Sequence, residues 1–374
     1  MKKVVLLLSL LGLSLSFSGC ISNPINAYTA SRYFESGRQQ EAAGNMEAAR
    51  VNFSRAYGNT VMGNLPPAAK AHTLYEYARI SAYLAERAEA EKGFIEVLAL
   101  IKQAQGEADS LRAPTLAEYA RMLRDQGDHS KAVPIYDEAV TEMEKRSAET
   151  KYPVDFAHFL EDVAENLRAA GLVARADETT ARASALMAKN PGAVPAFAVW
   201  GTYASAAHAL IAKNNWGAAR GAMFRAVNEA ELLGLSPKTL VTLHYEYGRC
   251  LGVTGKFDDA ETHLLKALAF DKQLGGPFYM DLTELARLNY DQGKYPEANI
   301  YFEQDIQAMD HLGLADDSPA ASIDILSEYG VSLRKTGREF EAGAMDARIK
   351  TIRQAHPILV SHTDRTPYGR YRQP

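Results

Sequence analysis

The chain has 374 residues, of which 47% are hydrophobic and 23% charged, and its formal net charge is −5. These proportions are ordinary for a folded protein, and the length allows a sizeable hydrophobic core. A mildly acidic chain is not expected to bind nucleic acid. Its two cysteines are Cys20 and Cys250, which excludes a disulfide framework.

The first 19 residues have the pattern of a cleaved leader. Lys2 and Lys3 precede an uncharged apolar run from Val4 to Ser18. This run is shorter than the roughly 20 apolar residues that a membrane-spanning helix needs, so a signal peptide is favoured over a permanent span. No second long apolar segment follows in the sequence, and the rest of the chain is not expected to cross a membrane.

The leader ends at a small pair, Ser18 and Gly19, that directly precedes Cys20. This junction resembles the lipobox of bacterial lipoproteins, although Phe17 stands where that family usually has leucine. The resemblance implies cleavage before Cys20, attachment of lipid chains such as palmitate to this cysteine, and anchoring in the cell envelope. The residue after Cys20 is Ile21 and not aspartate. In Gram-negative lipoproteins the absence of aspartate there implies sorting to the outer membrane, with the protein facing the periplasm. The alternative is an ordinary secretory signal followed by a chance cysteine.

A glycine, a short polar turn and an alanine five residues after the glycine recur along the rest of the chain. Clear copies begin at Gly44, Gly127, Gly255 and Gly293. Glycine can adopt a positive φ and end one helix tightly, and the alanine lets a second helix lie close against the first. Successive alanines are 38 to 44 residues apart, and they are Ala49, Ala90, Ala132, Ala176, Ala219, Ala260, Ala298 and Ala342.

The residues around each alanine complete a helix-pair pattern. A large side chain follows four residues later, at Phe53, Phe94, Tyr136, Leu264 and Phe302. A second small residue follows three further on, at Ala56, Ala139, Ala183, Ala226 and Ala267. The segment before each glycine has the amphipathic spacing of a helix. Each unit is therefore predicted to be two antiparallel helices that bury their apolar faces only by stacking on neighbouring units.

This pattern resembles the tetratricopeptide repeat, and its period of about 42 residues resembles the longer repeats of kinesin light chains. The best match is the segment 285–295, LARLNYDQGKY. The resemblance implies an all-α, right-handed solenoid of stacked antiparallel helix pairs, with about eight repeats over residues 30–356. The predicted organisation is then a leader at 1–19, a lipidated N-terminus and linker at 20–29, the solenoid, and a basic flexible tail at 357–374.

Residues 193–200 join two of these units, and they are flanked or interrupted by Pro191, Gly192 and Pro195. These residues predict a longer connection than elsewhere, with a slight hinge between two halves of four repeats each.

The sequence contains no His-Glu-x-x-His metal motif, no glycine-rich phosphate loop and no paired cysteines with zinc spacing. Ser332 and Lys335 match the Ser-x-x-Lys pattern of penicillin-binding enzymes, but the companion motifs are missing and a chance match is favoured. Cys250 lies in a helical pattern and is predicted to be a small buried residue. The chain is not expected to be an enzyme or to need a cofactor, a metal or a small-molecule substrate.

Arginine recurs six residues before the glycine position in five of the eight units, at Arg38, Arg79, Arg121, Arg249 and Arg287. In tetratricopeptide proteins this face of the first helix lines the concave groove, so the resemblance implies a ladder with rungs about 8–10 Å apart. An extended chain rises about 3.3 Å per residue and would meet one rung about every three residues. With the nearby Tyr75, Tyr245 and Tyr290, these arginines form a candidate peptide-binding groove for an extended acidic segment.

Two alternatives stay open. The arginines could instead cover apolar surface and pair with acidic side chains of the neighbouring helix.

The end of the chain is basic, because six lysines and arginines from Arg348 onward stand against Asp364 alone. This end is either a solvated tail or a segment that contacts anionic lipid or an acidic partner.

The sequence therefore favours a lipid-anchored scaffold that binds other proteins of the bacterial cell envelope. An assembly factor or pilotin for a secretion, pilus or outer-membrane complex is a second hypothesis. A hydrolase with an unrecognised site is a third, which the lack of converging acids and nucleophiles disfavours.

Overall fold

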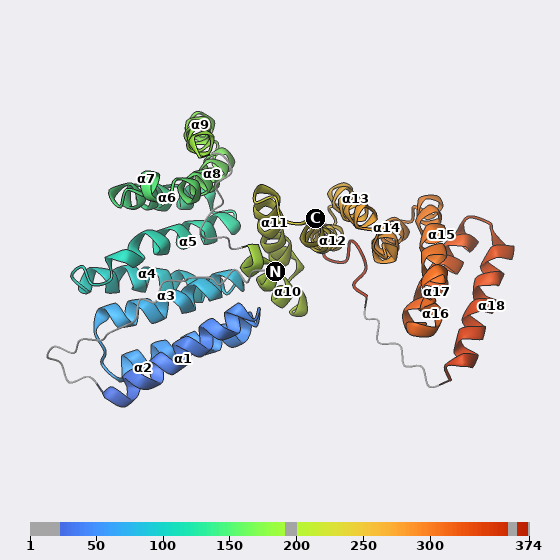
Figure 1. Cartoon of the computed structure of the whole chain (residues 1–374), viewed down its shortest axis with the longest axis horizontal. Coiled ribbons are helices and arrows are strands. Elements are labelled where there is room, and N and C mark those ends of the chain that lie inside the picture. Colours follow the sequence, from blue (N-terminus) through green and yellow to red (C-terminus); the bar gives the residue numbers. More distant parts are fainter. Residues whose placement is uncertain (1–22, 191–199, 358–364, 373–374) are drawn as a thin grey trace.

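The computed structural model of the chain describes residues 23–190, 200–357 and 365–372, and among these residues it contains helices and no strand (Figure 1). The all-α prediction is thereby confirmed. None of the helices in this part of the chain is both long and apolar enough to span a membrane. The leader and Cys20 lie outside the described residues, and their interpretation stays a prediction.

The long helices form eight antiparallel pairs, as the repeat pattern predicted. The pairs of the first half are α1 (Pro24–Ala42) with α2 (Met46–Met62), α3 (Pro67–Tyr83) with α4 (Arg87–Gln103), α5 (Arg112–Asp125) with α6 (His129–Lys145), and α8 (Pro153–Ala169) with α9 (Val173–Lys189). The pairs of the second half are α10 (Trp200–Ala212) with α11 (Trp216–Leu232), α12 (Pro237–Val253) with α13 (Phe257–Leu274), α14 (Tyr279–Asp291) with α15 (Tyr295–Leu312), and α17 (Pro319–Lys335) with α18 (Glu339–Ala355). Three short elements lie in connections: η1 (Asp109–Leu111), α7 (Ala148–Lys151) and α16 (Leu314–Asp317).

The solenoid begins earlier than the predicted boundary at residue 30. The side chain of Asn23 accepts a hydrogen bond from the backbone N–H of Ile25, and Pro24 occupies the first helical position. Both features favour a helix start, so α1 takes up part of the predicted linker 20–29. At the other end α18 stops at Ala355, one residue before the predicted boundary.

The predicted turns have the expected backbone. Gly255 and Gly293 adopt φ values of +82° and +74° between the helices of their pairs. Where the sequence lacks this glycine, Asn214 and Ala85 take the same left-handed conformation, with φ of +57° and +58°. Asparagine tolerates this conformation better than most residues, which explains why the unit at Ala219 keeps its turn.

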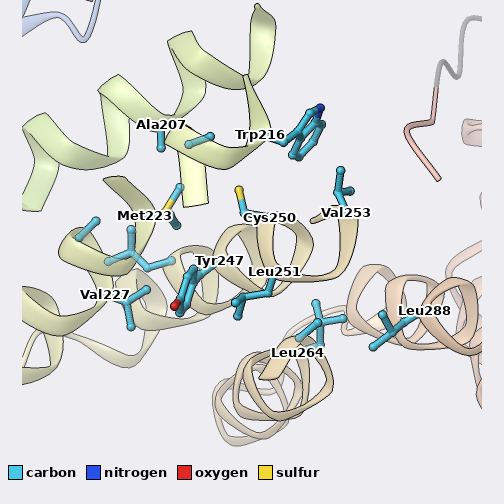
Figure 2. Packing of buried hydrophobic residues seen from close by; sticks show 14 of the residues in the cluster. Ala207, Trp216, Met223, Val227, Tyr247, Cys250, Leu251, Val253, Leu264 and Leu288 are labelled. Atoms are coloured by element: carbon cyan, nitrogen blue, oxygen red, sulfur yellow. The ribbon is translucent and has the colours of Figure 1, made fainter. Parts of the chain in front are cut away.

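The predicted small and large core positions are all buried. The eight repeat alanines are 0% exposed, and the five large side chains that follow four residues later are at most 1% exposed. Figure 2 shows one part of this core, where Trp216 and Met223 of α11 face Tyr247, Cys250 and Leu251 of α12. Cys250 is 0% exposed, as predicted. The pairs are therefore held together by close helix contact at alanine and by the large side chain beside it.

The regular stacking of pairs is interrupted between α9 and α10. The core of the first half ends at Ala183 and Leu186 of α9, whereas Ala206 of α10 joins a cluster with Met46 of α2 and Ile80 of α3. In Figure 1, α10 and α11 lie between an arm formed by α1–α9 and an arm formed by α12–α18. Helix α10 thus packs on apolar surface of α2 and α3, whereas the connection that was predicted to hold a slight hinge, residues 193–199, lies outside the described residues.

Candidate functional site

The predicted arginines lie on one face of the first helix of their units, which we call the ladder face. Four of them pair with a glutamate three residues earlier in the same helix. These pairs are Arg79 with Glu76 at 2.6 Å, Arg121 with Glu118 at 2.9 Å, Arg249 with Glu246 at 3.6 Å, and Arg287 with Glu284 at 3.6 Å. The glutamates form a repeated Glu-x-x-Arg motif in the sequence, and this motif was the signal for these pairs that the predicted site did not include.

The same four arginines also reach a carboxylate of a neighbouring unit. These pairs are Arg79 with Glu41 at 2.8 Å, Arg121 with Asp162 at 2.8 Å, Arg249 with Glu284 at 3.7 Å, and Arg287 with Glu328 at 2.8 Å. Each arginine therefore links two stacked helices, which is the arrangement that the acidic-pairing alternative predicted. Arg38 differs, because it is exposed and has no ion pair within the part of the chain that the structure describes.

The three predicted tyrosines lie on or beside the ladder face. The guanidinium of Arg249 lies 5.9 Å from the ring centre of Tyr245. Tyr290 meets Phe302 edge-on, with ring centres 6.2 Å apart, and so belongs to the margin of the core. Burial raises the pKa of Tyr75, with a further contribution from Glu118 and an opposing one from Arg79. The tyrosines therefore support the arginine pairs and the core more than they offer free rings.

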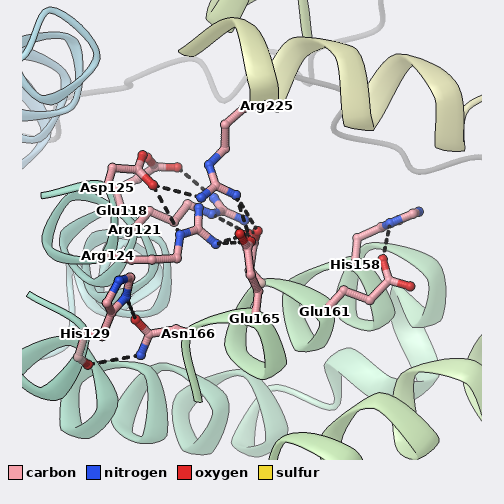
Figure 3. Close-up of polar contacts among 11 residues, drawn as sticks. Glu118, Arg121, Arg124, Asp125, His129, His158, Glu161, Glu165, Asn166 and Arg225 are labelled. Atoms are coloured by element: carbon pink, nitrogen blue, oxygen red, sulfur yellow. Dashed lines mark hydrogen bonds and ion pairs between the residues drawn. The ribbon is translucent and has the colours of Figure 1, made fainter. Parts of the chain in front are cut away.

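The ladder face of the first half centres on one half-buried carboxylate, that of Asp162 in α8. Figure 3 shows Arg121, Arg124 and Arg225, the three arginines that meet there. The oxygens of Asp162 lie 2.8 Å from Arg121, 2.8 Å from Arg124 and 3.5 Å from Arg225. Burial alone would raise the pKa of Asp162, but the three guanidinium groups outweigh burial and hold this pKa far below its usual range. Asp162 is therefore ionised at every physiological pH.

Arg225 shows that another part of the chain covers this face. It belongs to α11, and it also reaches Asp125 of α5 at 2.9 Å and Glu165 of α8 at 3.2 Å. Nearby, Tyr203 of α10 meets Tyr83 of α3 edge-on, with ring centres 5.1 Å apart. Of the ladder arginines of the first half, Arg79 and Arg121 are consequently paired, and α10 and α11 lie over the face beside them.

The ladder face of the second half is also occupied, by residues 365–372, which we call the C-terminal segment. Arg365 donates two hydrogen bonds of 2.6 Å to Asp291 at the end of α14 and one of 2.7 Å to Glu328 of α17. The backbone N–H of Tyr368 donates to the same Asp291 carboxylate at 2.8 Å. The sequence predicted a flexible tail from 357 to 374, but Arg365 binds two carboxylates of the ladder face, and residues 365–372 are docked there.

Tyr368 anchors the C-terminal segment in a pocket of its own. It is 6% exposed, and its hydroxyl donates a hydrogen bond to Glu284. The ring lies so close to Gly252 that a β-carbon there would stand 2.3 Å from the ring. Gly369 and Tyr371 then donate backbone hydrogen bonds of 2.9 and 3.0 Å to the carbonyls of Gly252 and Val253 at the end of α12. These contacts explain why α12 carries glycine at position 252.

Other titratable groups with shifted pKa values lie in α12 and α13. No group of three or more histidine, cysteine or acidic side chains that could hold a metal occurs in the part of the chain that the structure describes. Burial raises the pKa of the Cys250 thiol to about 12, so this cysteine is a poor nucleophile. The pKa of His263 is lowered to about 4, mainly by burial and to a smaller extent by the neighbouring His244. The rings of His263 and His244 share a hydrogen bond of 2.9 Å.

Antiparallel helix pairs, alanines at their contacts and a left-handed turn repeated about every 42 residues define this chain as a tetratricopeptide-like helical-repeat protein. No family profile matches the chain, and no curated protein matches it by sequence.

Solved structures resemble the chain in fold only. BtubC (BKLC) from P. vanneervenii is 16% identical, with 75% of this chain and 94% of that chain covered and a TM-score of 0.40. The apo form of RapI is 12% identical over 88% of this chain and 99% of that chain, with a TM-score of 0.37. A kinesin light chain of Podosopora anserina with nearly identical TPR-like repeats is 17% identical over 56% of this chain and all of that chain, with a TM-score of 0.35.

Proposed function

We propose that this protein is a lipid-anchored scaffold of the bacterial cell envelope that binds other proteins through its helical repeats. The observation that supports binding is the C-terminal segment, because the ladder face of the second half holds it through side-chain and backbone contacts. Stacked-repeat proteins offer extended surfaces of this kind to partners. The observation that supports anchoring is the Ser18-Gly19-Cys20 junction after a short apolar leader. The residue after it, Ile21, favours the outer membrane facing the periplasm.

Anchoring is tested by replacing the lipidated residue. We expect the protein to fractionate with membranes and Cys20→Ser to release it or to block its processing, because two or more acyl chains are needed for stable attachment. Cys250→Ser is the matched control, since this buried cysteine is far from the leader in the sequence and should leave fractionation unchanged. A wild-type protein that is found in the soluble fraction, and that carries no lipid by mass spectrometry, would contradict the anchoring proposal.

Binding is tested by capture from detergent-solubilised envelopes, with mass spectrometry to identify what is retained. We expect a small set of envelope proteins, each of which binds again when it is purified and added alone. If none of the captured envelope proteins binds again when it is purified and added alone, the scaffold proposal is contradicted.

A further inference from the structure

We infer that the ladder face of α12, α14 and α17 is a recognition site for a partner segment in which an arginine is followed three residues later by tyrosine and glycine. In the free protein, residues 365–372 occupy this site as an internal competitor. This inference rests on the proposed scaffold function, and it names the chemistry of the partner.

The arginine subsite consists of two carboxylates, and its cation is supplied by the C-terminal segment and not by the helices. Asp291 and Glu328 have side chains only 10% and 18% exposed. Arg287 neutralises one oxygen of Glu328, while Arg365 takes the other oxygen of Glu328 and both oxygens of Asp291. Without Arg365, Asp291 would lose this ion pair and Glu328 would keep only Arg287. A planar guanidinium satisfies both carboxylates through its fork of donors, which an ammonium group does not provide.

The tyrosine subsite is a pocket with one polar end. Gly252 and Leu288 lie against the ring of Tyr368, and Glu284 accepts a hydrogen bond from its hydroxyl. Glu284 is held from two sides by Arg249 and Arg287, at 3.7 and 3.6 Å. The pocket therefore selects an aromatic side chain that donates a hydrogen bond at its tip, and phenylalanine would leave the carboxylate without this donor.

The main chain of the segment is bound by two carbonyls at the end of α12. The last carbonyls of a helix have no partner inside the helix. At the end of α12, the carbonyls of Gly252 and Val253 accept from Gly369 and Tyr371 instead. Gly369 has a φ of +79°, a conformation that favours glycine directly after the tyrosine. Backbone contacts thus give affinity for a segment that turns after its tyrosine, and the arginine and tyrosine subsites give selectivity.

This chemistry is opposite in charge to the acidic segment that the sequence predicted. The ladder arginines already pair with carboxylates, and the groups that face the C-terminal segment are Asp291, Glu328 and Glu284. A partner with the same basic and aromatic chemistry must displace a segment tethered to the same chain. Short tethers give effective concentrations in the millimolar range, so the internal competitor should weaken partner binding strongly.

The test uses the full-length protein and a fluorescent peptide with the sequence of residues 365–372, RTPYGRYR. The double variant Arg365→Ala/Tyr368→Ala removes both anchors of the internal segment and leaves the ladder face intact. By fluorescence anisotropy, we expect it to bind the peptide at least tenfold more tightly than the wild type does. Arg370→Ala is the matched control, because Arg370 is exposed and should leave the internal segment in place.

A second variant acts on the pocket rather than on the segment. In the double-variant background, Gly252→Ala places a β-carbon where the tyrosine ring lies, and we expect it to weaken peptide binding at least tenfold. In the wild-type background, it should speed tryptic cleavage after Arg365 at least tenfold. Unchanged cleavage, or a folded double variant that binds the peptide no better than the wild type, would overturn the inference.

Three further outcomes separate this inference from its alternatives. A wild-type dimer that dissociates when Arg365 and Tyr368 are replaced would show that the segment belongs on a second copy, and would overturn the inference. If the double variant binds the peptide but no envelope partner is ever reconstituted, the recognition site stands and the scaffold proposal fails. If reconstituted partners bind wild type, double variant and Gly252→Ala equally, the scaffold proposal stands and this inference fails.

Discussion

Single charged residues on the ladder face form ion pairs with more than one partner. Glu284 meets Arg249 and Arg287, and Arg287 in turn meets Glu328, so that each charge belongs to two stacked helices. Half-buried ion pairs contribute little net stability compared with apolar packing, but breaking one by removing a partner is costly. Their regular occurrence between units indicates that they fix how one helix pair sits on the next.

Reversal of one ladder charge should show this cost. Arg121→Glu places a new acid beside Glu118 and Asp162, and we expect the free energy of unfolding to fall by about 3–5 kcal/mol. Arg38→Glu is the matched control in the same repeat position, and a change within about 0.5 kcal/mol is expected there because Arg38 is exposed. Urea unfolding measures both variants, and equal losses would show that the pairs do not stabilise the stack.

A buried acid at the second half should make stability depend on pH. Asp305 is 0% exposed and accepts a hydrogen bond of 2.7 Å from Thr283. Burial raises its pKa to about 7, against weaker lowering effects from Thr283 and Arg287 and small raising effects from Glu284 and Glu328. The folded protein therefore binds more protons here than the unfolded chain between about pH 4 and pH 7, and this group costs stability increasingly as pH rises through that window.

Asp305→Asn removes this titration and keeps the shape. We expect the variant to unfold with nearly wild-type free energy at pH 4.5 and to be more stable than the wild type at pH 8, by at most about 4 kcal/mol for a shift of three pKa units. Urea titrations at the two pH values give the difference. A variant that is destabilised equally at both would show that the ionised carboxylate is not the costly state.

The candidate site could be predicted only in part from the sequence. The arginine positions followed from the repeat register, and the paired glutamates were equally visible at three residues before them. The partners of Asp162 were not, because Arg225 lies 63 residues away from it in another helix pair. The sequence likewise held no signal that Arg365 would meet Asp291, since no local pattern relates residues 74 positions apart.

At the scale of helices, small residues set the spacing of each pair. Ala260 and Ala267 of α13 are 0% exposed, and Leu264 between them fills the space against Gly248 of α12. This periodic pattern is local in the sequence, and for that reason the helix pairs and their turns could be predicted almost completely. The α1 start was placed too late because its capping residue, Asn23, precedes the first repeat signal.

Overpacking at one of these alanines tests the helix contacts. Ala260→Leu should lower the free energy of unfolding by about 1–3 kcal/mol, because the added atoms have no space between α12 and α13. Ala269→Leu is the matched control, since Ala269 lies on the exposed face of the same helix. Thermal unfolding followed by circular dichroism compares the two, and equal shifts would mean that the helix contact lies elsewhere.

At the scale of the whole molecule, the chain covers its own ladder face twice. Helices α10 and α11 lie over the first half through Tyr203 and Arg225, and the C-terminal segment lies over the second half through Arg365 and Tyr368. In Figure 1 the end of the chain returns to α12. A regular solenoid would leave this face open along its length, so access of a partner depends on contacts that are distant in sequence.

One guanidinium group of α11 reaches three carboxylates of the first half. Arg225 is the residue of α11 that meets Asp125, Asp162 and Glu165, and Arg225→Glu would place a fourth acid among them. Loss of a buried charge partner across an interface costs about 2–5 kcal/mol, so we expect α10 and α11 to separate from the first half. Small-angle X-ray scattering should then show a larger radius of gyration than in the wild type.

Arg220→Glu is the control, because Arg220 of the same helix bonds to Thr254 within the second half, and this variant should leave the radius of gyration unchanged. A folded Arg225→Glu protein with the wild-type radius would show that apolar contacts such as Tyr83 with Tyr203 hold the two halves together without this charge.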